Sequence, residues 1–293
     1  MICSLNHKNN VLIIFMRIII YSIIFLICVI FYIHILYHMK TATDENIYEI
    51  DYTNRNNLNE MCELRQPFTF KLEKNVDINH NVIEGTGTPL NILKSKAIVI
   101  KKKEKEKEGV PEETMTKIYS EYNSKLVTND NIINELKSIE EQIIPEFTCN
   151  NSYDVIVSDD QFKSPITSNF NFRNFFLVTE GSIKIRFMSH KHNNKFDNDI
   201  DYELMQNVSS YDVWENPDKL HVSEISATKG DMIYIPPFWW YSIHYIEPTV
   251  IVKYQYRTIM NIVCNLYHYA CSYVTISKIE ENGKNKHLKI KQN

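Results

Sequence analysis

Three histidines in the sequence are candidate ligands for a transition metal, because imidazole is a common metal ligand. His190 and His192 form a His-x-His pair in a polar stretch, Asp197 follows them, and His244 lies further along the chain. Two imidazoles and a carboxylate with open positions form the ligand set of non-haem Fe(II) sites. If His190, His192 and Asp197 made up such a set, all three ligands would come from one loop. We expect that site to be weak, and an ordinary loop is the competing interpretation.

The stretch 235–243 reads IPPFWWYSI and joins two strand-like runs. Pro236 and Pro237 cannot donate to a sheet ladder, so they belong at a bend or edge that leads into a strand. Side chains alternate between faces along a strand, so Trp239, Tyr241 and Ile243 share one face and Trp240, Ser242 and His244 share the other. His244 therefore points away from Tyr241, which makes it a poor ligand beside that position.

Composition excludes several classes of protein. The 293 residues carry a formal net charge of -4, which allows one large or two small domains and gives no case for a nucleic-acid partner. The chain has 6 glycines and no phosphate-binding glycine motif. None of its 6 cysteines forms a CxxC pair, which favours structural thiols over a zinc site.

The segment 18–37 (IIIYSIIFLICVIFYIHILY) is apolar and has no acidic or basic residue apart from His34. As a helix it spans about 30 Å, enough to cross a bilayer and longer than the apolar region of a signal peptide. We expect a short tail over 1–17, a single-pass anchor over 18–37 and a polar linker over 38–50. Lys8 and Arg17 precede the segment, which places the N-terminus in the cytoplasm.

Residues 51–148 are expected to form an N-terminal, partly helical portion of the domain. The run 101–108 (KKKEKEKE) is typical of a solvated loop. Pro111 and the acids after it are a good helix start, and Asn129 or Asp130 can cap a second helix that ends before Pro145.

Residues 149–258 change to β character. Strands are expected at 153–157, 170–179, 182–188, 221–227, 232–235, 239–245 and 249–257. Glu180-Gly181 is a turn signal, so the second and third of these are predicted to form a hairpin. Short strands at regular spacing indicate a closed antiparallel sandwich or barrel.

Residues 259–293 are expected to form a helix capped by Thr258 and a polar tail from Lys278. Apolar residues recur along this helix at helical spacing, namely Ile259, Ile262, Val263, Leu266, Ala270 and Tyr273. The stripe could support a homodimer, or it could cap the β domain.

The region 149–258 resembles the cupin superfamily, and most closely its JmjC-type hydroxylase branch. The spacing of Gly230, Pro236, Trp239 and Trp240 resembles the second cupin motif, and 174–184 resembles the strands after the first. The resemblance implies a mainly β fold with flanking helices, a double-stranded β-helix (jelly roll), preceded here by one transmembrane helix. The whole is similar to cupin-like membrane-anchored proteins of large DNA viruses and algae, which implies a viral or host membrane.

Active members of this family bind Fe(II) and 2-oxoglutarate. Their first ligand motif falls on 167–172, which has no histidine or carboxylate, and their second-motif histidine falls on Tyr241. All three iron ligands are therefore missing, and Tyr241 is expected to fill the metal's space. Lys184 matches a position that holds the 2-oxoglutarate carboxylate in some members. The alternative interpretation is an ordinary strand lysine, since Lys184 and Arg186 lie on the same face of the expected strand.

The first hypothesis is a membrane-anchored, cupin-like domain without catalytic activity or cofactor, with a binding or structural role toward an unknown protein or small molecule. The first alternative is an Fe(II)/2-oxoglutarate hydroxylase with displaced ligands. The second is a small-molecule cupin, such as an isomerase, that uses the His190/His192 loop. The resemblance supports architecture more than activity, because one fold hosts many functions.

Overall fold

The computed structural model describes residues 2–72, 76–90, 119–123, 126–196, 199–202, 205–215, 221–275 and 277. The charge run 101–108, the helix start at Pro111, Asp197 and the tail from Lys278 lie outside the described residues. The chain divides into two compact units, Met1–Lys40 and Thr41–Asn293, and each is described by itself.

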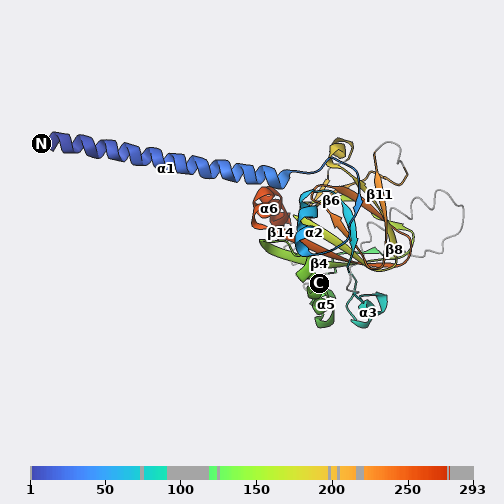
Figure 1. Cartoon of the computed structure of the whole chain (residues 1–293). Helices are drawn as coiled ribbons and strands as arrows, with labels where there is room; N and C mark the ends of the chain where they lie inside the picture. Colours follow the sequence, from blue (N-terminus) through green and yellow to red (C-terminus); the bar gives the residue numbers. More distant parts are fainter. Residues whose placement is uncertain are drawn as a thin grey trace, which may run out of the picture. The chain divides into compact units, whose positions relative to one another are not determined.

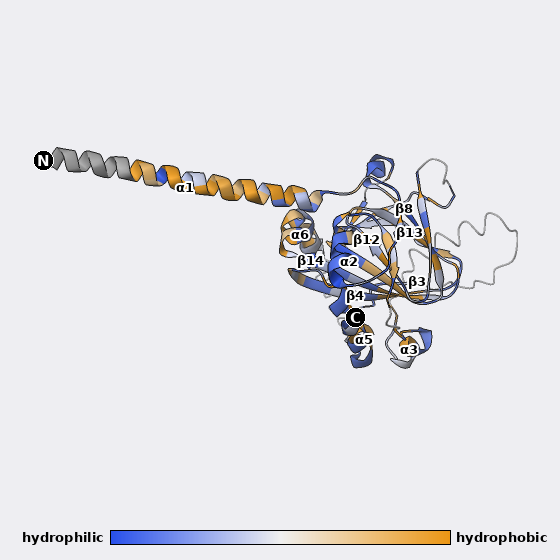
Figure 2. Cartoon of the chain, viewed as in Figure 1, coloured by the Kyte–Doolittle hydropathy of each residue, from blue (hydrophilic) through white to orange (hydrophobic). Residues whose placement is uncertain are grey.

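The first unit is one long helix, α1 (Ile2–Met39), whose side chains are almost all apolar after the first turns (Figure 2). Its segment Ile13–Met39 has 27 residues and a mean hydropathy of 2.9. At about 1.5 Å per residue it is long enough to cross a hydrocarbon core of about 30 Å. It contains the predicted 18–37 segment, and by length and composition it is a candidate membrane anchor or signal sequence.

The second unit is mainly β, as predicted, and contains two large sheets with helices around them (Figure 1). Sheet A has the order β1 (Tyr48–Glu49), β2 (Phe68–Lys71), β12 (Asp231–Ile235), β7 (Arg173–Glu180), β14 (Thr249–Thr258), β4 (Thr148–Ser158) and β3 (Tyr119–Ser120). Sheet B has the order β11 (Ser223–Thr228), β8 (Ser182–Met188), β13 (Trp240–Tyr245), β6 (Ile166–Asn169), β10 (Gln206–Ser209) and β9 (Asp199–Asp201), and β5 (Phe162–Lys163) pairs with β13. The pairs are antiparallel except for β1 with β2.

The two sheets face each other across one apolar core. Sheet A contributes Phe176, Ile233 and Ile251, and sheet B contributes Ile185, Tyr241 and Ile243. The alternation of side chains along each strand leaves a second apolar face on sheet A, and helices cover it. These are α2 (Arg55–Glu63), α3 (His80–Gly85), η1 (Leu126–Thr128) and α5 (Asp130–Ile143). A small third cluster, which includes Met188 and Trp240, lies on the outer face of sheet B.

Helix α5 forms where the sequence predicts the second helix of the N-terminal portion. The Asn129 side chain accepts a hydrogen bond from the Asn131 backbone N–H and so caps the first turn. Its buried residues recur every three or four positions, which turns one apolar face toward sheet A (Ile132, Leu136, Ile139 and Ile143). The first predicted helix does not extend to residues 119–120, which form β3 instead.

The predicted hairpin of β7 and β8 is wrong. β7 pairs with β12 and β14 in sheet A, whereas β8 pairs with β11 and β13 in sheet B. The turn at Glu180-Gly181 therefore carries the chain from one sheet to the other. Gly181 has φ +82°, and a Cβ there would lie 2.4 Å from the Pro248 carbonyl oxygen. A local turn signal identifies the reversal but not the sheet that receives the next strand.

We predict that Gly181→Ala lowers the free energy of unfolding by about 2–4 kcal/mol. Alanine is strained at a positive φ, and its Cβ would clash with the Pro248 carbonyl oxygen. Gly230→Ala is the matched control, since Gly230 has φ +94° but open space around its Cβ position. It should cost about 1–2 kcal/mol. Urea unfolding of the full chain in mild detergent measures both values. Equal losses for the two variants would contradict the close approach at Gly181.

Part of the expected linker 38–50 belongs to the second unit. Ala42 and Ile47 pack against the core between the sheets, and residues 48–49 form β1. The Lys191 ammonium donates to the Thr43 carbonyl oxygen at 2.7 Å. The folded unit therefore begins at about residue 42, immediately after α1.

Candidate functional site

The stretch 235–243 contains the bend that its prolines predict, and this bend carries the chain from one sheet to the other. β12 ends at Ile235, the chain bends through Pro236 and Pro237, and β13 begins at Trp240 in the other sheet. Trp239 lies in the core between the sheets and donates from Nε1 to the Arg65 carbonyl oxygen at 3.0 Å. Trp240 faces the other way and donates to Asn193 Oδ1 at 2.6 Å. The predicted alternation of faces is confirmed.

Tyr241 is buried between the sheets and marks the candidate site. It pairs with Thr167 of β6, and its ring lies edge-on to the ring of Phe176 from sheet A, with centroids 5.6 Å apart. Burial raises the pKa of its phenol, and the nearby Lys253 offsets part of that effect. Tyr241 therefore stays neutral and fills the interior of the sandwich with an aromatic ring.

Within the window 167–172, the residues that face Tyr241 are Thr167 and Asn169, whose polar side chains interact with the phenol. Ser168 turns the other way, and its hydroxyl accepts a hydrogen bond from Asn207 at 2.9 Å. Phe170 stacks on His268 with centroids 4.7 Å apart. The strand register thus identifies Thr167 and Asn169 as the residues of this window that point toward Tyr241.

A buried ion pair lies beside Tyr241. Lys253 Nζ is 3.5 Å from Glu121 Oε1, and the side chains are 2% and 6% exposed. Asp154 is the register partner of Lys253 on β4 and is also buried. Burial alone would lower the pKa of Lys253, but Tyr241, Glu121 and Asp154 together outweigh it and raise that pKa. Lys253 is therefore a charged ammonium that faces two acidic groups.

The segment 119–123 brings Glu121 into this position. Two carboxylate oxygens of Asp154 accept the backbone N–H groups of Tyr122 at 2.9 Å and Asn123 at 2.7 Å, which ties the segment to β4. Tyr119 stacks on Phe162 at 4.4 Å and donates its hydroxyl to Glu121 Oε2 at 2.9 Å. The short edge strand β3 therefore inserts one carboxylate between the sheets.

The sequence reasoning missed Glu121, Asp154 and Lys253. One signal was present, because Lys253 has the same strand parity as the buried Ile251 within the run TVIVKYQYR. A lysine at an inward position of a strand needs an acidic partner. No feature of the sequence near Glu121 identifies it as that partner.

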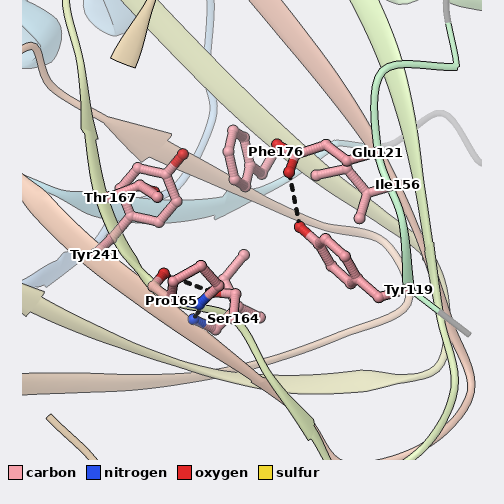
Figure 3. Close-up of a pocket in the computed structure, with 9 residues that line it drawn as sticks. Tyr119, Glu121, Ile156, Ser164, Pro165, Thr167, Phe176 and Tyr241 are labelled. Atoms are coloured by element: carbon pink, nitrogen blue, oxygen red, sulfur yellow. Dashed lines mark hydrogen bonds between the residues drawn. The ribbon is translucent and has the colours of Figure 1, made fainter. Parts of the chain in front are cut away.

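A small pocket opens between these groups (Figure 3). Tyr241 and Thr167 form one wall, Phe176 and Ile156 lie across from them, and Glu121 with Tyr119 closes one side. Its empty space is about 260 Å³, including the part open to solvent. The part of that space in which the centre of a water molecule fits is only about 10 Å³, which is about enough for one water.

The residues around Tyr241 do not fit an Fe(II) ion. A phenol, a hydroxyl and an amide from Tyr241, Thr167 and Asn169 replace the two imidazoles and the carboxylate that such a site uses. In the part of the chain that the structure describes, no group of three His, Cys, Asp or Glu side chains could hold a metal ion. The one carboxylate at the pocket, Glu121, already pairs with Lys253.

The predicted His190–His192 pair lies in η2 (His190–Lys195), away from the pocket residues. His192 Nε2 is 3.1 Å from Glu45 Oε1, and His221 Nδ1 is 2.7 Å from Glu45 Oε2. Ser189 also donates to Glu45 Oε1, at 2.9 Å. This Glu45 cluster attaches the first residues of the folded unit to sheet B, so His192 has a structural partner.

His244 faces away from Tyr241, as predicted, and its ring lies 5.2 Å from the ring of Trp214. Burial, followed by Lys163 and Lys184, lowers the pKa of His244. The imidazole is therefore neutral at pH 7 and packs in an aromatic contact on the outer side of sheet B.

Lys184 also lies on the outer face of sheet B, where its Nζ is 3.7 Å from Glu224 Oε1. Arg186 shares that face and binds the same carboxylate at 2.7 Å. Ile183, Ile185 and Phe187 face the core, so the predicted alternation of β8 is confirmed. Lys184 does not line the pocket beside Tyr241, which agrees with the interpretation as an ordinary strand lysine.

Two comparisons with known proteins give no match. A search against protein-family models finds none, and a search of curated proteins finds none either. The geometry around Tyr241 and the composition of α1 are therefore the features that distinguish the possible functions.

Proposed function

We propose that this chain is a membrane-anchored, cupin-like domain that catalyses no reaction and has a binding or structural role. The observation that carries the proposal is the filled interior of the sandwich. The ring of Tyr241 occupies it, Thr167 and Asn169 face the phenol, and Lys253 is neutralised by Glu121 from the same chain. A site whose charges are already paired internally has little to offer a charged cofactor or substrate.

We further propose that the β domain is a jelly roll. The eight central strands in chain order are β4, β6, β7, β8, β11, β12, β13 and β14. Numbered one to eight, they have the order 6-3-8-1 in sheet A and 5-4-7-2 in sheet B. The fourth and fifth strands pair with each other, and every other pair joins strands that are not consecutive in this numbering. This pattern supports the double-sheet arrangement of a jelly roll.

The anchoring rests on α1. Its apolar segment is long enough to span a bilayer, and Lys8 and Arg17 toward its N-terminal end favour a cytoplasmic N-terminus. The folded unit would then face a lumen or the outside, on a viral or host membrane if the family resemblance holds.

The two alternatives have less support. An Fe(II)/2-oxoglutarate hydroxylase would need His244 or Lys184 at the pocket, and both lie on the other side of sheet B. A small-molecule cupin at the His190/His192 loop would need His192, which pairs with Glu45.

The proposal is tested by ligand content. The full chain, purified in mild detergent without a histidine tag, should contain no stoichiometric iron by elemental analysis and should not bind 2-oxoglutarate in equilibrium dialysis with added Fe(II). Stoichiometric iron that is lost on His190→Ala, His192→Ala or His244→Ala would overturn it, since these side chains are the candidate ligands.

A second experiment tests whether positions 167, 169 and 241 correspond to the iron-ligand positions of the resembling family. We expect Thr167→His combined with Asn169→Asp and Tyr241→His to create Fe(II) binding, because these three positions face one another. The matched control is Ser168→His with Phe170→Asp and Tyr241→His, in which two new ligands point away. If both variants fold and neither binds iron, the cupin resemblance of this site fails while the non-catalytic proposal stands.

A further inference from the structure

The C-terminal helical segment, residues 266–275, presents large apolar side chains to solvent. Leu266, Tyr267, Tyr273 and Val274 are 61%, 71%, 76% and 49% exposed. Their spacing of one, seven and eight positions places them on one side of the helix, where they form the outward stripe. The sequence predicted an apolar stripe here, and the barrel-capping interpretation of it is wrong for these residues.

The opposite side of the helical region is the side that docks. His268 stacks on Phe170 with ring centroids 4.7 Å apart, and Asn261 of the preceding helix α6 (Ile259–Cys264) donates to the Phe170 carbonyl oxygen at 2.8 Å. Ser272, on this inner side, is buried. An amphipathic helix on a water-soluble domain normally buries its large apolar residues, whereas this one exposes four of them.

Two further exposed apolar residues lie at the start of the helical region. Thr258 pairs with Thr148, and the residues next to them in the chain are Ile259, 65% exposed, and Phe147, 86% exposed. Exposed apolar groups of this size on several elements mark a surface that contacts protein or membrane.

We propose that the outward stripe lies in the headgroup region of a lipid bilayer, the same bilayer that α1 spans. This inference rests on the proposed membrane anchoring. Only Lys40 and Thr41 separate the end of α1 from Ala42, which packs in the folded unit, so no long spacer separates that unit from the anchor. The tether gives the bilayer a high effective concentration at the folded unit.

The composition and the length of the stripe select lipid over a second copy of the chain. Tyrosine, which supplies two of the four stripe residues, is enriched at membrane interfaces because its ring is apolar and its hydroxyl is polar. The stripe also covers less than two heptads, whereas a coiled-coil seam needs about three or four.

The experiment uses the full chain in vesicles of phosphatidylcholine. A fluorophore on Val274→Cys, with the other cysteines except Cys62 replaced by serine, reports lipid contact. Acyl-brominated lipid should quench it by about half if the stripe lies at the boundary of headgroups and acyl chains. The control fluorophore on Glu141→Cys, an exposed site on α5, should not be quenched. Leu266→Ser with Tyr273→Ser should abolish the quenching at 274.

Three results would overturn the inference. Equal fluorescence at position 274 with and without brominated lipid rejects the lipid contact. If carbonate does not extract the chain from the same vesicles, the anchoring stays intact. Carbonate extraction of the chain rejects both. A doubled mass in detergent that returns to the monomer value with Leu266→Ser and Tyr273→Ser assigns the stripe to a second copy.

Discussion

Replacing Lys253 by methionine should lower the free energy of unfolding of the folded unit by about 3–5 kcal/mol. The ammonium lies between two buried acidic groups, Glu121 and Asp154, and its removal leaves them without a countercharge. Methionine keeps most of the side-chain volume, so the loss reports charge and not a cavity. Urea unfolding followed by tryptophan fluorescence measures it, because Trp214, Trp239 and Trp240 all lie in this unit.

Two variants control for this result. Lys229→Met removes a half-exposed lysine whose partner Asp77 is also exposed, and it should change the free energy by less than about 1 kcal/mol. Lys253→Met with Glu121→Gln removes both charges and should recover part of the loss. If Lys253→Met behaved like Lys229→Met, the interior would contain water that screens the pair.

Replacing Trp239 by alanine should lower the free energy of unfolding by about 3–5 kcal/mol. Trp239 is fully buried between the sheets and donates from its indole to the Arg65 carbonyl oxygen, which lies before β2. The change opens a cavity at the crossing from β12 to β13 and removes a contact between distant parts of the chain. Circular dichroism during urea unfolding measures the loss, since the variant lacks one fluorophore.

Trp239→Phe separates the two contributions. It retains most of the ring but leaves the Arg65 carbonyl without its donor, which should cost about 1–3 kcal/mol. Trp214→Phe is the matched control, because Trp214 is half-buried on the outer side of sheet B. A loss for Trp239→Ala no larger than for Trp214→Phe would show that the double-tryptophan stretch does not support the sandwich.

Local features of the fold could be predicted from the sequence where one short-range rule decides them. The alternation of Ser182–Met188 gives β8 its two faces, and the polar side chains of Asn129 and Thr258 cap the helices that follow them. The bend at Pro236-Pro237 follows from the missing N–H donors. Each of these signals depends on residues within one element.

The features that sequence reasoning missed depend on long-range pairing. β7 and β8 are adjacent in the chain but join different sheets, and no local residue encodes that choice. Glu121 and Lys253 are more than a hundred residues apart in sequence. They meet because β3, the strand before Glu121, pairs with the edge of β4. Helical periodicity locates the stripe that contains Leu266 and Tyr273, but the side that docks is set by Asn261 and the Phe170 carbonyl.

The position of β14 within sheet A has a consequence for biosynthesis. β14 lies between β7 and β4 and pairs with both, and its partners on β4 are about 100 residues earlier in the chain. Until the ribosome has made residues 249–258, the strands on the two sides of β14 cannot be joined into sheet A. α1 precedes these strands in the chain, so under the proposed anchoring a translocation machinery would engage it long before the domain can close. The chain would then be inserted first and fold afterwards, with its unpaired strands exposed in between.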